Sequence, residues 1–129
     1  MAKILIADDS RFQVELVASG LRQKGHEISV AQDVVQAGML ALRNSPDLIV
    51  LDVNMPGGSG IEVLKRLRRS AKTQNIPVVV VSGSCDNDVQ HVAMELGAVE
   101  FLRKPVDVEQ LSSLLTGLLS AKEREKALH

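Results

Sequence analysis

Five short runs rich in Val and Ile, distributed along the whole chain, constrain the fold more than any other feature. They span residues 3–7, 27–31, 47–51, 77–82 and 99–102. The first, third and fourth are apolar almost without interruption, which is typical of strands buried on both faces of a parallel sheet. The segments between the runs favour helices; in the fourth segment, Val89, Val92 and Leu96 fall on one helix face. This alternation predicts an α/β fold of five strand–helix units with a parallel sheet covered by helices.

Residues that commonly end helices support the same division of the chain. Ser10 is expected to cap the first helix, and Asp107 with Gln110 resembles a capping box for the last. Gly25 and Gly97 follow the first and fourth helices, where a residue with left-handed backbone often ends the helix.

The last helix is expected from residue 107 to about 119 and continues into a charged, helix-favouring tail. We therefore divide the chain into a domain of residues 1–120 and a tail of residues 121–129. This tail is either a frayed helix end or the start of a connector to another domain. The leucines of the last helix are too many for one core face, so packing in the core is expected for most and a dimer or partner interface for the rest: Leu111, Leu114, Leu115, Leu118 and Leu119.

Size and composition exclude several classes of protein. The 129 residues fit one domain, and the formal net charge of −1 provides no broad attraction to nucleic acid or anionic membranes. The densest basic segment, KRLRRSAK, has no aromatic neighbour to stack on bases, and we interpret it as the exposed face of a helix. The single cysteine, Cys85, excludes an internal disulfide, and neither a secretory signal nor a membrane span is visible. A cytoplasmic protein is expected.

Polar residues that can handle a phosphoryl group follow or end four of the five apolar runs. They are the acidic pair Asp8 and Asp9, the single carboxylate Asp52, the hydroxyl of Ser82 and the ammonium of Lys104. The carboxyl ends of parallel strands meet at one edge of a sheet, and in open α/β sheets the ligand site lies beyond that edge. We therefore expect these side chains to converge on one site.

The chemistry of such a site requires a metal ion. Three carboxylates placed together repel one another unless a cation is present, and Mg²⁺ prefers oxygen ligands while keeping part of its water shell. Asp52 is then a candidate nucleophile toward phosphorus, forming an acyl phosphate. Mg²⁺, Lys104 and Ser82 would each stabilise one oxygen of the transferring group.

With these motifs in order, the chain resembles the receiver domain of two-component response regulators along essentially its whole length. The matching elements are DDS at 8–10, LDVNMPGGSG at 51–60, VSGS at 81–84 and FLRKP at 101–105. The resemblance implies a flavodoxin-like, doubly wound three-layer sandwich, with five helices around a parallel five-stranded sheet of order 2-1-3-4-5. Asp52 is implied to be the phospho-acceptor, supplied by a histidine kinase or a phosphotransfer protein.

The resemblance also assigns the metal ligands. Mg²⁺, or Mn²⁺ in its place, is implied to bind Asp9 and Asp52 directly together with the backbone carbonyl of Asn54. Asp8 is implied to act through a water molecule.

For the remaining site residues, the resemblance implies a switch. Lys104 contacts the phosphoryl group, Ser82 moves toward it after transfer, and Phe101 rotates inward with Ser82. The bond between Lys104 and Pro105 is implied to be cis. The surface of the fourth helix, fifth strand and fifth helix would then change and control homodimerisation or binding of an effector. Such a domain is a phosphoprotein that catalyses its own phosphorylation and dephosphorylation and is not a turnover enzyme.

Three other functions stay open on the residues alone. A phosphohydrolase with an Asp nucleophile would need a second acid two residues after Asp52, where the chain has Asn54. A flavin carrier would need a phosphate-binding first loop, but Asp8 and Asp9 in that loop would repel phosphate. An interaction module that keeps only the fold would bind its partners equally well without Asp52.

Overall fold

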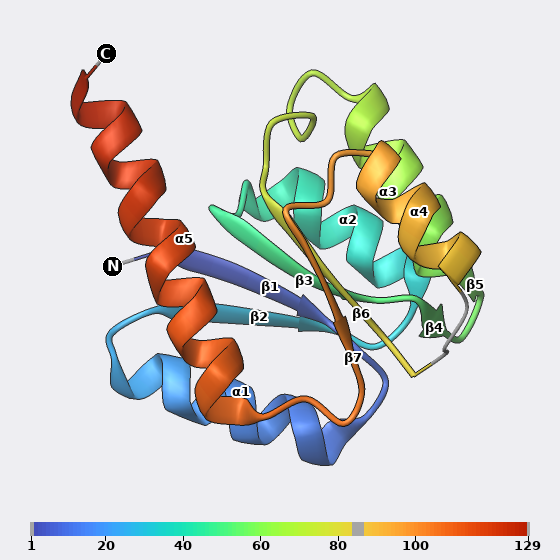
Figure 1. Ribbon diagram of the computed structural model, residues 1–129, viewed down its shortest axis with the longest axis horizontal. Coiled ribbons are helices and arrows are strands. Elements are labelled where there is room, and N and C mark those ends of the chain that lie inside the picture. The colour runs from blue at the N-terminus through green and yellow to red at the C-terminus, as the bar shows by residue number, and fades with distance from the viewer. Residues whose placement is uncertain (1, 84–86, 129) are drawn as a thin grey trace.

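A single parallel sheet forms the centre of the protein (Figure 1). The structure, a computed structural model, describes residues 2–83 and 87–128, so that Cys85 and His129 lie outside the described residues. The sheet has the order β2-β1-β3-β6-β7, and all neighbouring strands are parallel. Its strands are β1 (Lys3–Ala7), β2 (Glu27–Ala31), β3 (Leu48–Asp52), β6 (Val78–Ser82) and β7 (Glu100–Arg103). The predicted parallel sheet and its implied order are both confirmed.

Five helices cover the two faces of this sheet, as expected, and make the three layers of a flavodoxin-like sandwich (Figure 1). The helices α2, α3 and α4 pack on one face, and α1 and α5 pack on the other. Their bounds are α1 (Arg11–Gln23), α2 (Val34–Asn44), α3 (Gly60–Arg69), α4 (Asn87–Glu95) and α5 (Val108–Leu128). No helix among the described residues combines the length and the apolar character that a membrane span requires.

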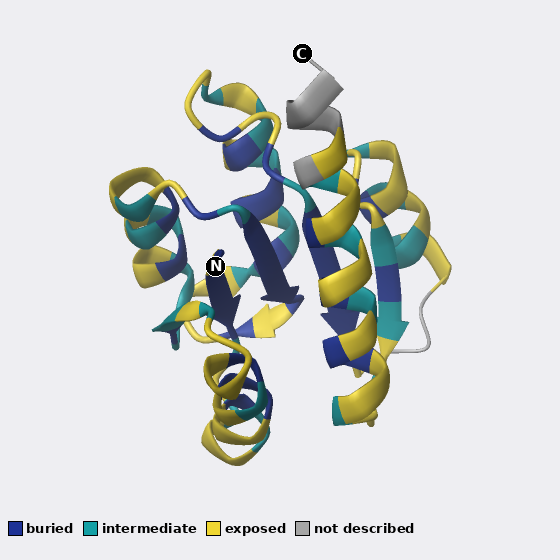
Figure 2. Cartoon of the chain, turned by 90° about the vertical axis from the view of Figure 1, so that its left-hand side faces the viewer, coloured by how far each residue is buried: buried dark blue, intermediate teal, exposed yellow. Residues whose placement is uncertain are grey.

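Burial explains why the apolar runs are continuous rather than alternating. Every residue of β3 and of β6 is buried, since both strands are covered by helices on either side (Figure 2). Successive side chains point to opposite faces. In β1, for example, Leu5 joins the core under α2, α3 and α4, whereas Ile4 and Ile6 join the core under α1 and α5.

The helix ends agree with the sequence in part. Gly25 and Gly97 have positive φ angles of 90° and 83°, and the Asp107 carboxylate accepts hydrogen bonds from the first amides of α5. Ser10 occupies the N-cap of α1 as expected, but the expected capping is only partly confirmed, because its side chain accepts no capping hydrogen bond. Its backbone amide instead donates to the Asp8 carboxylate at 2.9 Å. The turn before α1 is therefore closed by Asp8.

The helix α5 continues unbroken through the tail to Leu128. Leu111, Leu115 and Leu119 are buried, while Leu114 and Leu118 are half-buried against the same core, so packing accounts for the wide apolar stripe.

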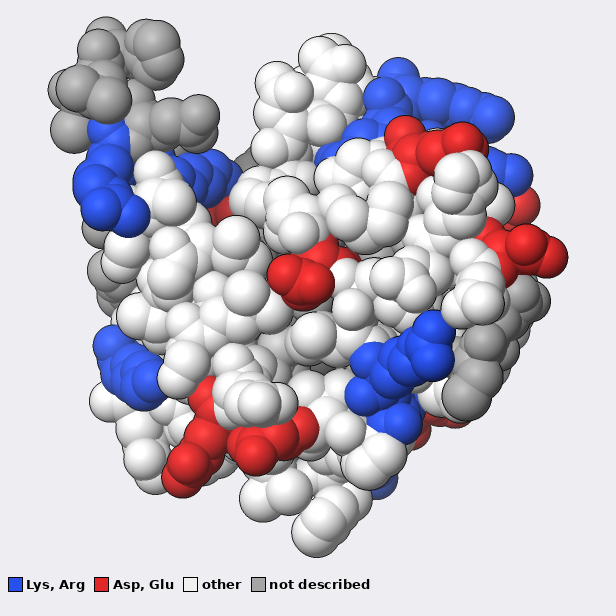
Figure 3. Space-filling view, in the orientation of Figure 1, with Lys and Arg blue, Asp and Glu red and all other residues white. Residues whose placement is uncertain are grey.

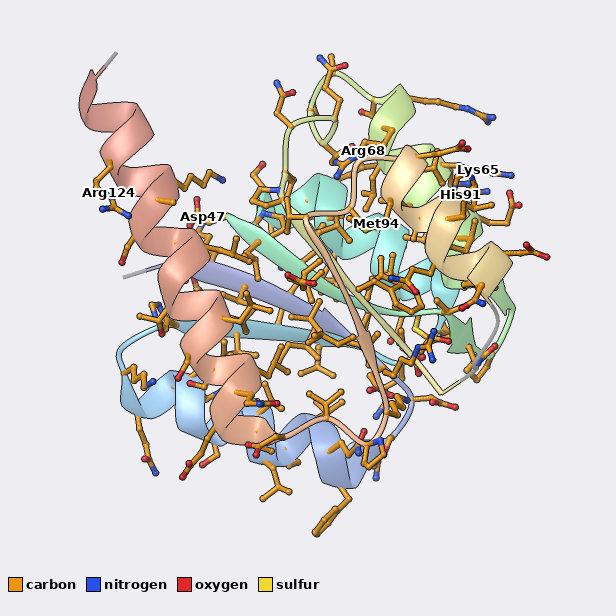
Figure 4. The ribbon with its side chains drawn as sticks, viewed as in Figure 1. Asp47, Lys65, Arg68, His91, Met94 and Arg124 are labelled. Atoms are coloured by element: carbon orange, nitrogen blue, oxygen red, sulfur yellow. The ribbon has the colours of Figure 1, made fainter. Side chains whose placement is uncertain are left out.

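Arg68 has a structural role that the sequence did not reveal. We interpreted its segment as an exposed helix face, but the guanidinium is partly buried between the loop after α3 and the end of α4 (Figure 4). It donates hydrogen bonds of 2.8–3.1 Å to four backbone carbonyls, which are those of Gln74, Ile76, Leu96 and Gly97. Carbonyls at a helix end have no partner within the helix, so a cation placed there stabilises them. Arg68 thus joins α3, its following loop and α4.

The neighbouring arginine allows a direct test of this role. We expect Arg68→Met to lower the free energy of unfolding by about 3 kcal/mol, because several carbonyls lose their only charged donor. Arg69→Met should change it by less than about 0.5 kcal/mol, since Arg69 is exposed on the same helix. Urea unfolding of the two variants measures this difference. Equal effects would show that the Arg68 hydrogen bonds add nothing to stability.

Candidate functional site

Three carboxylates meet at the carboxyl edge of the central strands. Asp8 and Asp9 follow β1, and Asp52 is the last residue of the neighbouring strand β3. One carboxylate oxygen from each residue lies within 4.8 Å of the others. This convergence, expected from the sequence, provides the all-oxygen donor set that a hard divalent cation such as Mg²⁺ prefers.

Asp52 is the buried member of the cluster, with 1% of its surface exposed. The backbone amide of Asn54 donates to its Oδ1 at 3.1 Å, and the Lys104 Nζ donates to its Oδ2 at 3.0 Å. Burial raises the pKa of Asp52, and the negative charge of Asp8 adds to this effect. The hydrogen bonds from Lys104 and Asn54 oppose the shift without cancelling it. The two hydrogen bonds therefore fix the position of the carboxylate, but they do not fully replace the water that its charged form has lost.

Lys104 connects the far edge of the sheet to this carboxylate cluster. It follows β7, its amide donates to the Ser82 carbonyl at 2.9 Å, and its peptide bond to Pro105 is cis, as the resemblance implied. Its Nζ lies 3.0 Å from Asp52 Oδ2 and 3.7 Å from Asp8 Oδ1. Burial acts to lower the pKa of Lys104, but the hydrogen bond and charge of Asp52, with the charges of Asp8 and Asp9, outweigh it and raise that pKa. The ammonium is thus kept protonated beside the Asp52 carboxylate.

Asp8 and Asp9 differ in their surroundings. Asp8 is partly buried, and its Oδ1 accepts the Ser10 amide, which fixes the orientation of the carboxylate. Asp9 is exposed at the rim of the site. Among the three carboxylates, Asp9 is therefore the one that faces solvent.

The two residues expected to act as the switch lie on adjacent strands. Ser82 is the last residue of β6 and is fully buried, and Phe101 in β7 is 9% exposed and pairs in register with Val80. Since Val80 and Ser82 are two residues apart, they point to the same face of the sheet. Phe101 packs in the core on that face, beneath α2, α3 and α4. Ser82 and Phe101 therefore lie on neighbouring strands and on the same face of the sheet.

Sequence analysis missed how the loop after Asp52 is held. No strand was expected between Asp52 and the third helix, but Asn54–Met55 (β4) and Gly58–Ser59 (β5) form a two-stranded antiparallel hairpin. The hairpin returns the chain so closely that a Cβ at Gly60 would overlap the carbonyl oxygen of Asp52 and lie 2.9 Å from the Val53 Cα. The Gly60 amide also donates to the Val53 carbonyl at 2.7 Å. A glycine at the end of the LDVNMPGGSG motif was the available signal.

Comparison with known families now identifies the chain. Residues 4–116 match the model of the response regulator receiver domain. The chain therefore belongs to this family, whose members accept phosphoryl groups in two-component signal transduction. Mg²⁺ binding through acidic residues is typical of the family, and the Asp8, Asp9 and Asp52 cluster fits it.

The relatives differ in their architecture. The chain is 32% identical to protein PilH of Pseudomonas aeruginosa, over 93% of this chain and 99% of that protein. It is 35% identical to the DNA-binding dual master transcriptional regulator RpaA of Synechocystis, over 96% of this chain but 52% of that one. The chain thus spans about half the length of RpaA and of the phosphate regulon regulator PhoB of Pseudomonas aeruginosa.

Solved structures agree on the fold. The chemotaxis response regulator CheY4 of Vibrio cholerae is 30% identical, with a TM-score of 0.83, over 90% of this chain and 97% of that one. A CheY-like receiver domain of Methanospirillum hungatei has a TM-score of 0.89 at 21% identity, over 97% of this chain and 98% of that one, and supports the fold alone.

Gly60 provides a first test of how Asp52 is positioned. We expect Gly60→Ala to lower the free energy of unfolding by about 2 kcal/mol through overlap with the Asp52 backbone. The loss should appear although alanine favours a helix over glycine by about 1 kcal/mol. Gly20→Ala is the matched control, because Gly20 lies in α1 with nothing within 4 Å of its Cβ position. Urea unfolding should show Gly20→Ala to be stabilising, and a stabilising Gly60→Ala would contradict the close approach.

Asp52 itself provides a test of pH dependence. Its folded-state pKa is raised, so the stability that it contributes is complete below the unfolded-state pKa of about 3.9 and is lost as the pH rises through the folded-state value. Without metal at pH 7, Asp52→Asn should therefore raise the free energy of unfolding by about 1 kcal/mol. The difference should vanish near pH 3.5, where both side chains are neutral.

Urea unfolding at the two pH values, in buffer freed of metal with a chelator, measures this effect. Adding Mg²⁺ should stabilise the wild type more than Asp52→Asn, because only the folded site binds the ion. A variant less stable than wild type at pH 7 would mean that the Lys104 and Asn54 hydrogen bonds outweigh burial.

Proposed function

We propose that Asp52 is the phospho-acceptor of this receiver domain. The observation that carries the proposal is a buried carboxylate 3.0 Å from the Lys104 ammonium and within 4.8 Å of two further carboxylates. A carboxylate oxygen of Asp52 attacks the phosphorus of a phosphohistidine, and an O–P bond forms as the P–N bond breaks. The electron pair of the broken bond stays on the imidazole nitrogen of the donor. The product is an aspartyl phosphate.

The surrounding residues supply electrostatic stabilisation. Asp9, Asp52 and the Asn54 carbonyl would hold Mg²⁺ or Mn²⁺, with Asp8 acting through water. The ion would neutralise charge on the phosphoryl oxygens. Lys104 already donates a hydrogen bond to the Asp52 carboxylate, so its ammonium is placed to stabilise the negative charge of the phosphoryl oxygens during transfer. We propose that the domain assists only its own phosphorylation and dephosphorylation.

We infer that α1 receives the phosphoryl donor. Phe12 is 77% exposed and Leu16 is 47% exposed, one helical turn apart and directly after Asp9. An exposed Phe beside a charged site favours contact with an apolar surface on a partner. A histidine kinase or phosphotransfer protein docked there would bring its phosphohistidine to Asp52.

The output surface is proposed on α4, β7 and α5. Phosphorylation adds about two negative charges, which would attract the Ser82 hydroxyl and thereby alter the packing of Phe101. In Figure 3 the face over these elements is largely uncharged but carries separate acidic and basic groups, and Met94 and Val99 are exposed by 46% and 41%. A homodimer or a downstream effector would bind this surface. We assign the receiver function to residues 1–120, with residues 121–129 as a charged helical tail or a linker, in a cytoplasmic protein.

Intact mass after incubation with acetyl phosphate tests the acceptor. We expect one added phosphoryl group in the presence of Mg²⁺ and none after treatment with a chelator or in Asp52→Asn. Asp47→Asn is the control, because Asp47 is a half-buried carboxylate at the opposite edge of the sheet. Phosphorylation that persists in Asp52→Asn would move the acceptor to another residue. The absence of any adduct, with no binding of the beryllofluoride mimic, would leave a module that retains only the fold.

A further inference from the structure

The outer face of α2 exposes three large apolar side chains that the receiver function does not use. Val35, Met39 and Leu42 are exposed by 63%, 49% and 49%. Their spacing of four and three residues places them in one row along the helix. Surface apolar residues scattered singly need no explanation, whereas contiguous exposed apolar surface favours a binding role.

A groove accompanies this row between α2 and α3. It has a volume of about 230 Å³ and is lined on the α2 side by the three apolar side chains and Gly38. Leu67 and Thr73 line the α3 side, and the Thr73 hydroxyl is already satisfied by donating to the Leu67 carbonyl at 2.7 Å. The absence of a side chain at Gly38 keeps the groove open, because a Cβ there would meet only the Arg66 guanidinium, at 4.0 Å. Most of the lining is therefore apolar, and an apolar ligand would leave the Thr73 hydrogen bond intact.

One arginine lines the groove, and two more lie near it in sequence on the same two helices. Arg66 lines the groove, Arg69 lies three residues further along α3, and Arg43 lies four residues after Met39 on α2. All three are exposed, and none of the ion pairs among the described side chains (residues 2–83, 87–122 and 124) involves them. The nearby Glu62 instead pairs with Lys65 at 3.5 Å. The groove thus combines an apolar floor with an uncompensated positive rim.

We propose that this groove binds an amphipathic helix of a partner protein, with acidic residues on either side of its apolar stripe. The row from Val35 to Leu42 spans about two helical turns, or roughly 10 Å, which matches the anchors of a helix lying in a groove. Glutamates flanking that stripe would face the arginines. A second copy of this chain fits less well, because a twofold contact would place the same arginines opposite one another.

The position of the groove leaves the phosphorylation machinery free. The helix α3 packs against α2 on one side and α4 on the other, so it separates the groove from the proposed output surface. The helix α1 lies on the opposite face of the sheet. A helix bound between α2 and α3 could therefore stay in place while a donor uses α1, and would serve as a tether independent of output.

A designed peptide tests this inference without knowledge of the partner. The probe is a fluorescent helical peptide of about 18 residues with a leucine stripe at helical spacing and glutamates beside it. One control has the same composition in shuffled order, and another replaces each glutamate by lysine. Anisotropy measures affinity for the full chain, and amide chemical shifts locate the bound peptide.

Matched variants separate the groove from other exposed apolar surface. Met39→Glu and Arg66→Glu should each weaken binding of the acidic peptide by at least about tenfold. Met94→Glu and Arg22→Glu, at exposed positions of α4 and α1, should change it by less than about twofold. Arg66→Glu should in addition improve binding of the lysine peptide. Circular dichroism verifies that each variant is folded.

Several outcomes would overturn the proposal. Equal affinity for the acidic and shuffled peptides would do so, as would shifts confined to α1 or to α4, β7 and α5. A dimer seen by sedimentation and lost in Met39→Glu would assign the groove to a second copy. Binding to phosphatidylglycerol vesicles that is lost in the same variant would assign it to a membrane surface.

Discussion

The carboxylate of Asp52, buried among other charges, is the constraint on which the rest of the structure depends. A charge in this position loses its water and is repelled by Asp8, and its hydrogen bonds with Lys104 and Asn54 compensate only in part. The backbone around this group fixes the position of the carboxylate. Three features fix it: the fully buried strand β3, the hairpin of β4 and β5, and the close return of the chain at Gly60. Burial of this charge lowers the stability of the metal-free fold, and in the proposed function the same carboxylate is the nucleophile toward phosphorus.

The same hairpin links the acceptor to the surface that we propose for partner binding. The Val34 amide at the start of α2 donates to the Pro56 carbonyl at 3.3 Å, and the Val34 side chain lies against Gly57. The elements that carry the acceptor and the α2–α3 groove are thus in contact, although the groove opens away from the site. On the other face of the sheet, α1 begins directly after the carboxylates of Asp8 and Asp9 and exposes Phe12. One helix layer thus contacts the hairpin that follows Asp52, and the other begins beside Asp8 and Asp9.

Most of the fold could be predicted because buried strands and amphipathic helices each require a recognisable pattern of apolar residues along the chain. The runs of Val and Ile placed all five sheet strands within a residue of their observed bounds, and the cluster of Asp8, Asp9 and Asp52 followed from the parallel arrangement. Ser10 occupies the N-cap position of α1 as expected, but its side chain accepts no capping hydrogen bond, and Asp8 accepts the Ser10 amide instead. The roles of Arg68 and Gly60 were missed, because each acts on backbone atoms supplied by other segments.

The sequence by itself determined the order of strands and helices, the edge at which the polar residues gather and the family to which the chain belongs. These properties depend on local periodicity and on motifs of a few residues, which can be read along one segment at a time. Only the tertiary structure decided the partners of Lys104 and Arg68, the burial of Asp52 and the apolar groove between α2 and α3. Each of these arises where segments distant in the chain come together, and distance, desolvation and exposure exist only once they have done so.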